Sequence, residues 1–223
     1  GAQRFRFADT LGLLDPFAAY RHIAQLRRTV DLDIEMHAHD DLGMATANTV
    51  AAVLAGATHI NTTVNGLGER AGNAPLEEVV MALRLVHSLE TGIDTRRFPA
   101  ISRLVSAASG RPVAANKSIV GDSVFTHEAG IHVDGLLKDV RTYQGLDPNE
   151  VGRVHRIVLG KHSGAAAIVQ AYAHLGITLD EKRAGEILAH VRRHAVATKH
   201  APDSTDLKRF YWETAPCAPE LTQ

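Results

Sequence analysis

Two histidines separated by one residue, His37 and His39, are the first side chains whose types and spacing suggest chemistry. The residues before them, from Leu32 to Met36, alternate between apolar and polar, as in a half-buried strand. Side chains two apart on a strand point to the same face, so the two imidazoles would lie close enough to share one ion. Because neutral imidazole is the commonest metal ligand, the pair predicts a metal site.

The end of this strand carries two acids, Asp40 and Asp41. A carboxylate there can ligate a metal or hold a ligand histidine in one tautomer. The chain has 13 histidines, so some pairs with this spacing are also expected by chance. The position before Gly43 and a helical run favours the metal site, because parallel α/β folds place their chemistry at the carboxyl ends of strands.

The first strand, residues 4–9, ends beside a possible substrate ligand, Thr10. Its hydroxyl would face the same rim as the two histidines and could hold a substrate carboxylate; a helix cap or loop hydrogen bond is the alternative. Arg4 lies six residues earlier and deeper along the strand, where it would pair with a core carboxylate or reach substrate.

A glycine-rich loop, residues 65–73, follows the third expected strand and ends at Asn73. Its glycines allow close approach of backbone to a ligand, although a tight strand–helix turn explains them equally well. The spacing is not that of a dinucleotide-binding fingerprint.

A second histidine-rich stretch, residues 125–135, contains His127 and His132 among glycines and acids, and Tyr143 follows shortly after. Imidazole titrates near neutrality and can act as a general acid or base. A surface loop with ordinary polar residues is the alternative.

The remaining pattern supplies the elements that position these residues. Strands alternate with helices in the first part of the chain, which favours a parallel sheet. The first expected strand is 4–9, the second begins at residue 32 and carries both histidines, and the third is 58–64. The expected helices between and after them are about 17–28, 44–54 and 75–89. A short helix at 101–109 and a loop-rich stretch at 118–135 follow, and from about residue 146 the pattern is helical, with helices at about 165–175, 181–199 and 204–212.

Composition narrows the class of protein. The chain has 223 residues, 45% of them hydrophobic, and a net charge of -1, so neither a nucleic-acid partner nor a membrane partner is expected. No apolar run approaches the roughly 20 residues that span a bilayer, and the start does not read as a signal peptide. The single cysteine, Cys217, cannot form an internal disulfide and suits a cytoplasmic location.

Five motifs resemble, in order, those of the homocitrate synthase and 2-isopropylmalate synthase family. They are Phe-Ala-Asp-Thr-Leu-Gly at 7–12, His-Ala-His-Asp-Asp-Leu-Gly at 37–43, Asn-Gly-Leu-Gly-Glu-Arg-Ala-Gly-Asn at 65–73, Phe-Thr-His-Glu-Ala-Gly-Ile-His-Val-Asp-Gly at 125–135 and Leu-Gly-Lys-His-Ser-Gly at 159–164. The amino-acid sequence at 58–65 and 125–135 is most similar to that of homocitrate synthases of nitrogen-fixing bacteria.

The resemblance implies an α/β fold, the (β/α)₈ TIM barrel, followed by two small, mostly helical subdomains. The chain would hold the last three β/α units in residues 1–92, a linker subdomain with the histidine-rich loop in 93–145, and a helical subdomain in 146–223. The family's first-strand motif, which supplies the metal carboxylate, does not occur in this sequence. We therefore expect a fragment that is inactive alone, or one half of a split enzyme.

The resemblance also implies a reaction, the condensation of acetyl-CoA with 2-oxoglutarate to homocitrate, assisted by a divalent Mg, Mn or Zn ion. The family's two metal histidines match His37 and His39, and an asparagine close to the metal matches Asn73. Thr10 matches the threonine that binds the 2-oxo acid carboxylate. His127 and Tyr143 match an acid–base pair that enters the neighbouring subunit's site, which implies a homodimer that exchanges subdomains.

Two alternatives remain open at this point. Isopropylmalate or citramalate synthesis differs only in the 2-oxo acid, whose side chain would be lined mainly by strands outside this sequence. A non-catalytic subunit or assembly module, which contributes helices and the His127 stretch to a partner, belongs to another class.

Overall fold

The computed structural model describes residues 1–215, so Cys217 lies outside the described residues. The chain divides into two compact units, of which the first comprises residues 1–124 and 148–153 and the second residues 125–147 and 154–223. The three-part division at residues 92 and 145 stays a prediction.

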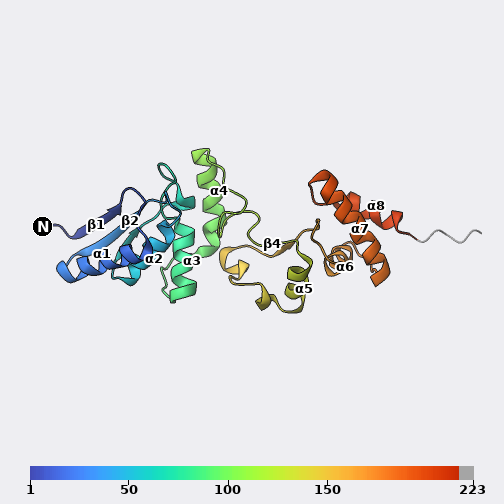
Figure 1. Cartoon of the computed structure of the whole chain (residues 1–223), viewed down its shortest axis with the longest axis horizontal. Coiled ribbons are helices and arrows are strands. Elements are labelled where there is room, and N and C mark those ends of the chain that lie inside the picture. Colours follow the sequence, from blue (N-terminus) through green and yellow to red (C-terminus); the bar gives the residue numbers. More distant parts are fainter. Residues whose placement is uncertain (216–223) are drawn as a thin grey trace, which may run out of the picture. The chain divides into compact units, whose positions relative to one another are not determined.

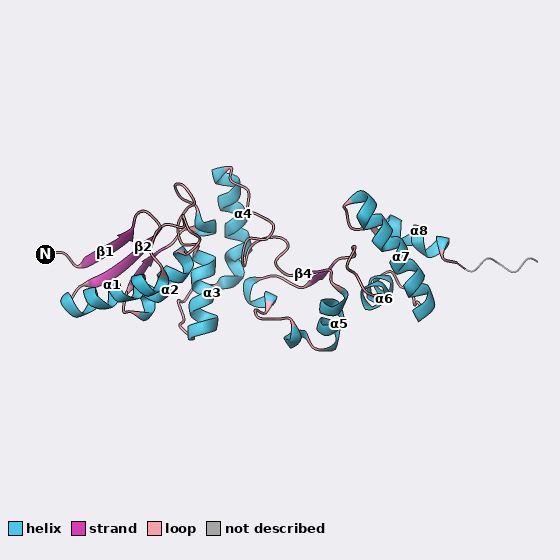
Figure 2. Cartoon of the chain, in the orientation of Figure 1, coloured by secondary structure: helices cyan, strands magenta, loops and turns pink. Residues whose placement is uncertain are grey.

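The first unit contains a parallel sheet in the order β1-β2-β3, formed by Arg4–Asp9, Asp33–Ala38 and His59–Asn61. Helices alternate with these strands, and Figure 1 shows α1 and α2 alongside β1 and β2. The first three helices are α1 (Pro16–Thr29), α2 (Ala45–Leu54) and α3 (Leu76–His87). The expected α/β pattern with parallel strands is therefore confirmed for this unit (Figure 2).

The two faces of the sheet differ in chemistry. Ile34, Met36 and Ala38 on β2 are fully buried in a core that they share with residues of all three helices. The alternate residues Glu35 and His37 point to the opposite face, because side chains alternate along a strand. That face is polar, and its charged and amide side chains are the ones that matter for the site.

A cluster of charged side chains, Arg4, Arg6 and Glu35, lies on the polar face toward the amino ends of β1 and β2. Glu35 is 5% exposed and lies 3.1 Å from Arg4 Nη1 and 2.7 Å from Arg6 Nη2. Burial alone would raise the pKa of the Glu35 carboxyl, but the hydrogen bonds and positive charges of the two arginines outweigh it and lower this pKa. The cluster keeps a buried carboxylate charged within the sheet.

The rest of the first unit consists of one further helix, α4, and short 3₁₀ turns. The helix α4 (Phe98–Ser109) begins with Phe98 buried and ends at Gly110, whose positive φ of 68° suits a glycine. Single 3₁₀ turns connect the longer elements; they are η1 (Val64–Gly66), η2 (Thr95–Arg97) and η4 (Pro148–Val151).

The second unit corrects two expectations from the sequence. The histidine-rich stretch expected as a loop forms a short strand, β4 (Thr126–His127), and a helix, α5 (Gly130–Lys138). The helical pattern expected from residue 146 is interrupted by β5 (Arg156–Ile157), which pairs in parallel with β4. A two-residue strand is too short to show a period, and Gly130 and Gly135 are poor helix formers, which explains both errors.

The remaining elements of the second unit are the turn η3 (Val140–Thr142) and the helices α6 (Ala165–His174), α7 (Glu181–Thr198) and α8 (Ser204–Glu213). The three helices share a core in which Tyr172 is fully buried and donates a 2.5 Å hydrogen bond to the Leu207 carbonyl oxygen. Burial raises the pKa of Tyr172 to about 12. None of the described helices is long and apolar enough to cross a membrane.

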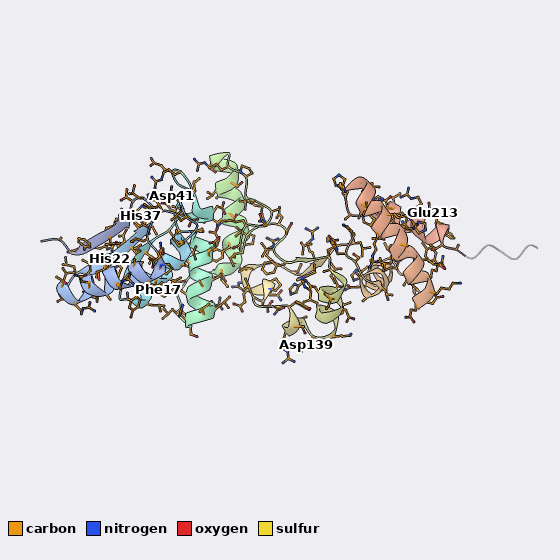
Figure 3. The ribbon with its side chains drawn as sticks, in the orientation of Figure 1. Phe17, His22, His37, Asp41, Asp139 and Glu213 are labelled. Atoms are coloured by element: carbon orange, nitrogen blue, oxygen red, sulfur yellow. The ribbon has the colours of Figure 1, made fainter. Side chains whose placement is uncertain are left out.

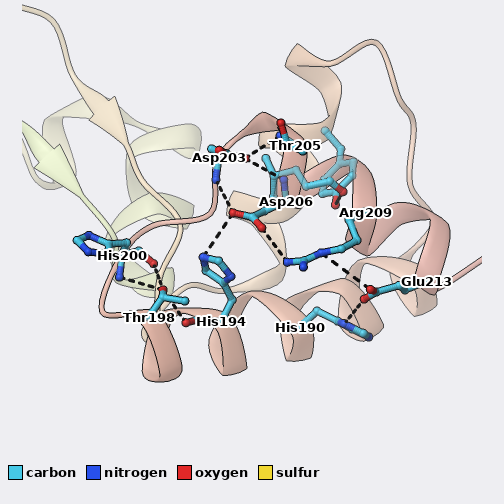
Figure 4. A network of polar contacts seen from close by, with 11 residues as sticks. His190, His194, Thr198, His200, Asp203, Thr205, Asp206, Arg209 and Glu213 are labelled. Carbon is cyan, nitrogen blue, oxygen red and sulfur yellow. Dashed lines mark hydrogen bonds and ion pairs between the residues drawn. The ribbon is translucent and has the colours of Figure 1, made fainter.

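Helix α8 starts with a capping box that also links it to α7 (Figure 4). Asp203 Oδ1 accepts hydrogen bonds from the backbone N–H groups of Thr205 at 2.8 Å and Asp206 at 2.9 Å. The Asp206 side chain lies 3.5 Å from His194 of α7, and Glu213 lies 3.1 Å from His190. The cap therefore fixes both the start of α8 and the carboxylate that meets α7.

Replacing Asp203 by alanine is expected to lower the free energy of unfolding of the second unit by about 1 kcal/mol, because two backbone N–H groups lose their hydrogen-bond acceptor. Asp203→Asn is the matched control, since its amide oxygen still accepts both bonds. Urea denaturation of the two variants measures the difference, and equal stability would contradict the capping role.

Candidate functional site

His37 and His39 lie together at the carboxyl end of β2, as their spacing predicts. Their ring centroids are 4.9 Å apart and the rings are nearly perpendicular, at 77°. Figure 3 labels His37 and Asp41 at this end of the strand. The pair belongs to the polar face, opposite the face that the helices cover.

The glycine-rich loop brings Asn73 to the same place. His39 and Asn73 form an isolated antiparallel bridge. The Asn73 N–H donates to the Gly66 carbonyl oxygen at 3.0 Å, and the Asp40 N–H donates to the Gly72 carbonyl oxygen at 3.0 Å. These backbone bonds hold an amide side chain beside the second histidine, and thus unite two segments more than 30 residues apart in sequence.

Three atoms of His37, His39 and Asn73 have a lone pair that could coordinate a bound ion. Nδ1 of His39 and Oδ1 of Asn73 are buried and have no hydrogen-bond partner among residues 1–215. His37 Nδ1 lies 3.0 Å from Oδ1 of Asn61; because an amide oxygen only accepts, Nδ1 carries the proton and Nε2 keeps its lone pair. Buried polar atoms are rarely left without a partner, so these atoms fit a bound ion.

The donor set is two imidazole nitrogens and one amide oxygen, which suits a divalent metal. Among the described residues no three His, Cys, Asp or Glu side chains are grouped to hold a metal, so a metal bound here would need the Asn73 amide oxygen as its third ligand from this chain. Burial is the main cause that lowers the pKa of His37, and this favours the neutral ring that a metal requires.

The two acids after β2 have other partners. Asp40 Oδ1 accepts from the Ala45 N–H at 2.8 Å, where α2 begins. Asp41 forms an ion pair with Arg70, with 2.9 Å between Oδ1 and Nε, and the hydrogen bond from Arg70 is the main cause that lowers the pKa of Asp41. Neither carboxylate is hydrogen-bonded to His37 or His39 within the part of the chain that the structure describes, so these acids shape the rim of the site.

The structure separates the two expected substrate ligands. Thr10 directly follows β1, next to the residue paired with Ala38, and its carbonyl oxygen accepts a 2.7 Å bond from Arg70. Arg4 is paired with Asp33, four residues before His37. At about 3.3 Å per residue this is roughly 13 Å from the histidine pair. Thr10 therefore stands at the rim, whereas Arg4 binds Glu35 deeper on the same face.

Replacing Gly72 by alanine is expected to displace Asn73 and weaken the site. Gly72 has a φ of 96°, and an added Cβ would overlap the carbonyl oxygen of Gly66, the partner of Asn73. Backbone strain of this kind costs about 1–3 kcal/mol. Gly43→Ala is the matched control, because Gly43 also has a positive φ but open space around it. Calorimetric titration with Mn²⁺ measures the effect; equal affinity in the two variants would contradict it.

A second polar cluster lies in the second unit, around β4. His127 Nε2 is 3.0 Å from Nδ1 of His155, and His155 Nε2 is 3.0 Å from Oε1 of Gln144. Tyr143 packs its ring 4.4 Å from that of His132. His127 and Tyr143 thus join one cluster through different neighbours. The pKa of His127 is lowered, first by burial and then by the charges of His155 and His132.

Glycines hold this cluster together. An added Cβ on Gly135 would lie 2.5 Å from the Tyr143 ring, so the absence of a side chain lets that ring pack on α5. Gly130 and Gly164 cross so closely that a Cβ on Gly130 would come 2.8 Å from the Gly164 backbone nitrogen. The Gly130 N–H donates to the His162 carbonyl oxygen at 2.9 Å. Two of the sequence motifs, at 125–135 and 159–164, are therefore packed against each other.

The sequence did not indicate three polar residues of these two clusters, namely Asn61, Gln144 and His155. Asn61 is paired with His37 across the sheet, and this register is set by tertiary structure. His155 immediately precedes a strand of only two residues. The only feature of the sequence that could have indicated Asn61 is that it is a polar residue in the third strand.

Comparison with known proteins first gives the class. Residues 1–105 match the family model described as HMGL-like, and residues 119–199 match the model described as homocitrate synthase post-HMGL domain-like. The boundary between the two matches falls where the strand–helix pattern has ended. The two matches follow one another along the chain, and each covers less than half of it.

Individual relatives carry three different names. The chain is 53% identical over 211 residues to 2-isopropylmalate synthase 2 of Caldanaerobacter subterraneus, covering 95% of this chain and 55% of that protein. It is 50% identical over 208 residues to the homocitrate synthase of a Frankia strain, covering 93% and 51%. It is 47% identical over 195 residues to a putative (R)-citramalate synthase of Methanopyrus kandleri, covering 86% and 38%. The chain thus spans about half the length of the first two of these relatives and 38% of the third.

Proposed function

We propose that this chain carries the metal-binding histidines and the acid–base cluster of an acyltransferase that condenses acetyl-CoA with a 2-oxo acid. The observation that supports it most is a pair of buried atoms beside His37, His39 Nδ1 and Asn73 Oδ1, which have no hydrogen-bond partner among the described residues and could coordinate a metal ion. Leaving such atoms unpaired costs about 1–3 kcal/mol each, which a bound ion would offset. When bound, a divalent metal would polarise the keto group of the 2-oxo acid.

The chain's own residues have distinct roles in the proposal. The Thr10 hydroxyl at the rim binds the carboxylate of the 2-oxo acid. His127 takes a proton from the acetyl methyl group, whose C–H electron pair forms the new bond to the keto carbon, and Tyr143 gives a proton to the resulting alkoxide. Water then hydrolyses the thioester and releases CoA. The lowered pKa of His127 supports its role as a base, because the ring is then neutral near pH 7.

The acid–base pair acts, in this proposal, in the site of the second subunit of a homodimer. The resemblance to the synthase family supports this arrangement. The remaining strands of the barrel and a carboxylate ligand for the metal come from sequence other than these 223 residues. All activity measurements below therefore use the complete protein that contains this chain.

The proposed 2-oxo acid is 2-oxoglutarate, and the product is homocitrate. Similarity to the homocitrate synthases of Frankia and of Nostoc, at 50% and 46% identity, supports it. A second candidate is 2-oxoisovalerate, which would give 2-isopropylmalate, because the 2-isopropylmalate synthase 2 of Caldanaerobacter subterraneus is 53% identical.

A CoA-release assay with 2-oxoglutarate, 2-oxoisovalerate and pyruvate tests the proposal. We expect release that depends on the 2-oxo acid, is fastest with 2-oxoglutarate, stops with a chelator and returns with Mn²⁺ or Mg²⁺. Faster release with 2-oxoisovalerate or pyruvate would replace the proposed substrate but retain the reaction class. No release from a folded, metal-loaded protein would overturn the proposal in favour of a non-catalytic assembly module.

A further inference from the structure

The Arg70 side chain connects three loops at the carboxyl end of the sheet in the first unit. Its Nε and Nη2 atoms donate to the two carboxylate oxygens of Asp41, at 2.9 and 3.1 Å. Nη2 also donates to the carbonyl oxygen of Thr10 at 2.7 Å. Thr10 lies in the loop after β1, Asp41 in the loop after β2, and Arg70 itself in the glycine-rich loop after β3. One guanidinium group therefore holds the other two loops from the third.

Each of these loops carries a residue of the proposed site. Asp41 comes two residues after His39, and Asn73 comes three residues after Arg70. Thr10 is itself the proposed ligand of the 2-oxo acid carboxylate. The relative positions of the metal ligands and of the Thr10 hydroxyl therefore depend on how these loops are held together.

The backbone of Arg70 is in a conformation that favours glycine. Its φ is 53°, in the left-handed region, which is uncommon and strained for a residue with a side chain. Such strain persists where surrounding contacts fix the residue, and it is concentrated at functional sites. A glycine at this position would relieve the strain but would lose all three hydrogen bonds of the guanidinium group. The arginine side chain thus has a use that offsets its backbone conformation.

The loop after β1 also packs directly on Asp41. Gly12 has a φ of 64°, and an added Cβ would lie 2.6 Å from Asp41 Oδ2 and 2.9 Å from the Asp41 backbone nitrogen. The first loop therefore contacts the same carboxylate that Arg70 binds. This close packing leaves Asp41 little freedom to leave the guanidinium group.

We propose that Arg70 is a positioning residue, whose paired hydrogen bonds to Asp41 and bond to Thr10 hold the three loops as the metal and the 2-oxo acid require. The inference rests on the proposed function for the identity of these ligands. Arg70 acts through Thr10 and Asn73 and not on the reacting atoms, so its loss should weaken binding more than the chemical step. Its side chain is 43% exposed, and an exposed ion pair contributes little to global stability.

The change Arg70→Gln in the complete protein tests this role. We expect the Kd for Mn²⁺ and the KM for the 2-oxo acid each to rise by about 10-fold, an effect typical of residues that orient a ligand. The kcat at saturating metal and substrate, and the midpoint of urea unfolding, should stay near those of the wild type. Arg70→Lys should recover only part of the affinity, because an ammonium group cannot make the paired bonds.

Two further variants separate positioning from a general effect of surface charge. Asp41→Asn combined with Arg70→Gln should be no worse than Arg70→Gln alone, because both changes remove the same contact. Arg96→Gln is the matched control: Arg96 Nε also lies 3.0 Å from a carboxylate oxygen, of Asp94, but this exposed pair joins residues only two apart. Its Kd and KM should equal those of the wild type.

The outcomes distinguish this inference from the proposed function. Unchanged Kd and KM in a folded Arg70→Gln protein, additive losses in the double variant, or equal losses in Arg96→Gln would overturn the inference even if CoA release is found. Weaker Mn²⁺ binding in Arg70→Gln, in a protein that releases no CoA, would uphold the positioning role and overturn only the proposed reaction. A folded wild type that binds no Mn²⁺ would overturn both.

Discussion

Replacing His39 by alanine is expected to abolish metal-dependent turnover and metal binding together while the fold is retained. The ring supplies the buried Nδ1 that has no partner among the described residues, so its removal takes away a ligand and leaves Asn73 as the neighbour of a cavity. The loss of metal affinity should be at least about 100-fold, because residues that only orient a ligand already cost about 10- to 100-fold.

Two further variants make this result interpretable. Asn61→Leu removes only the partner that holds His37 Nδ1 and should fall in the intermediate range of about 10- to 100-fold. His22→Ala, on the exposed side of α1 (Figure 3), should bind metal as the wild type does. Metal content after dialysis and CoA release are measured on all three. Full activity in a well-folded His39→Ala protein would remove His39 from the site.

Replacing His127 by alanine is expected to lower turnover by about 10²–10⁴-fold, the range typical of a general acid or base. Binding of metal and of the 2-oxo acid should be nearly unchanged, because those ligands are proposed to contact His37, His39, Asn73 and Thr10. Steady-state kinetics and calorimetric titration of the metal distinguish this pattern from that of His39→Ala, which should lose both.

Mixing the inactive His127→Ala and His37→Ala proteins should restore about a quarter of the wild-type activity if the pair acts across a dimer interface. Half of randomly assembled dimers are mixed, and each of these has one site in which both histidines are intact. Subunit mixing is verified with differently tagged chains. No recovery in verified mixed dimers would place His127 in the site of its own subunit or outside catalysis.

The sequence predicts those features that depend on local spacing. The period of two places His37 and His39 on one face of a strand, and the alternation of strands and helices predicts the parallel sheet; both agree with the structure. The first strand was expected at residues 4–9 and is Arg4–Asp9. Such features follow from neighbouring residues and need no knowledge of the rest of the chain.

Features that depend on distant pairing were not accessible in the same way. Asn61 contacts His37 from 24 residues away and His155 contacts His127 from 28 residues away, and both contacts require a strand register. Helix α5 contains Gly130 and Gly135, whose low helix propensity hid it, although tight packing against Gly164 and Tyr143 requires both glycines. Packing thus overrides local preference around the cluster.

Anomalous diffraction tests the proposed metal site most directly. Crystals of the complete protein are grown with Mn²⁺, and data are collected above and below the manganese absorption edge. We expect one anomalous peak beside His37 Nε2, His39 Nδ1 and Asn73 Oδ1, at about 2.0–2.3 Å from each nitrogen, the range usual for such ligands. A peak at another set of residues, or density for a water molecule alone between the two histidines at saturating Mn²⁺, would contradict the site described here.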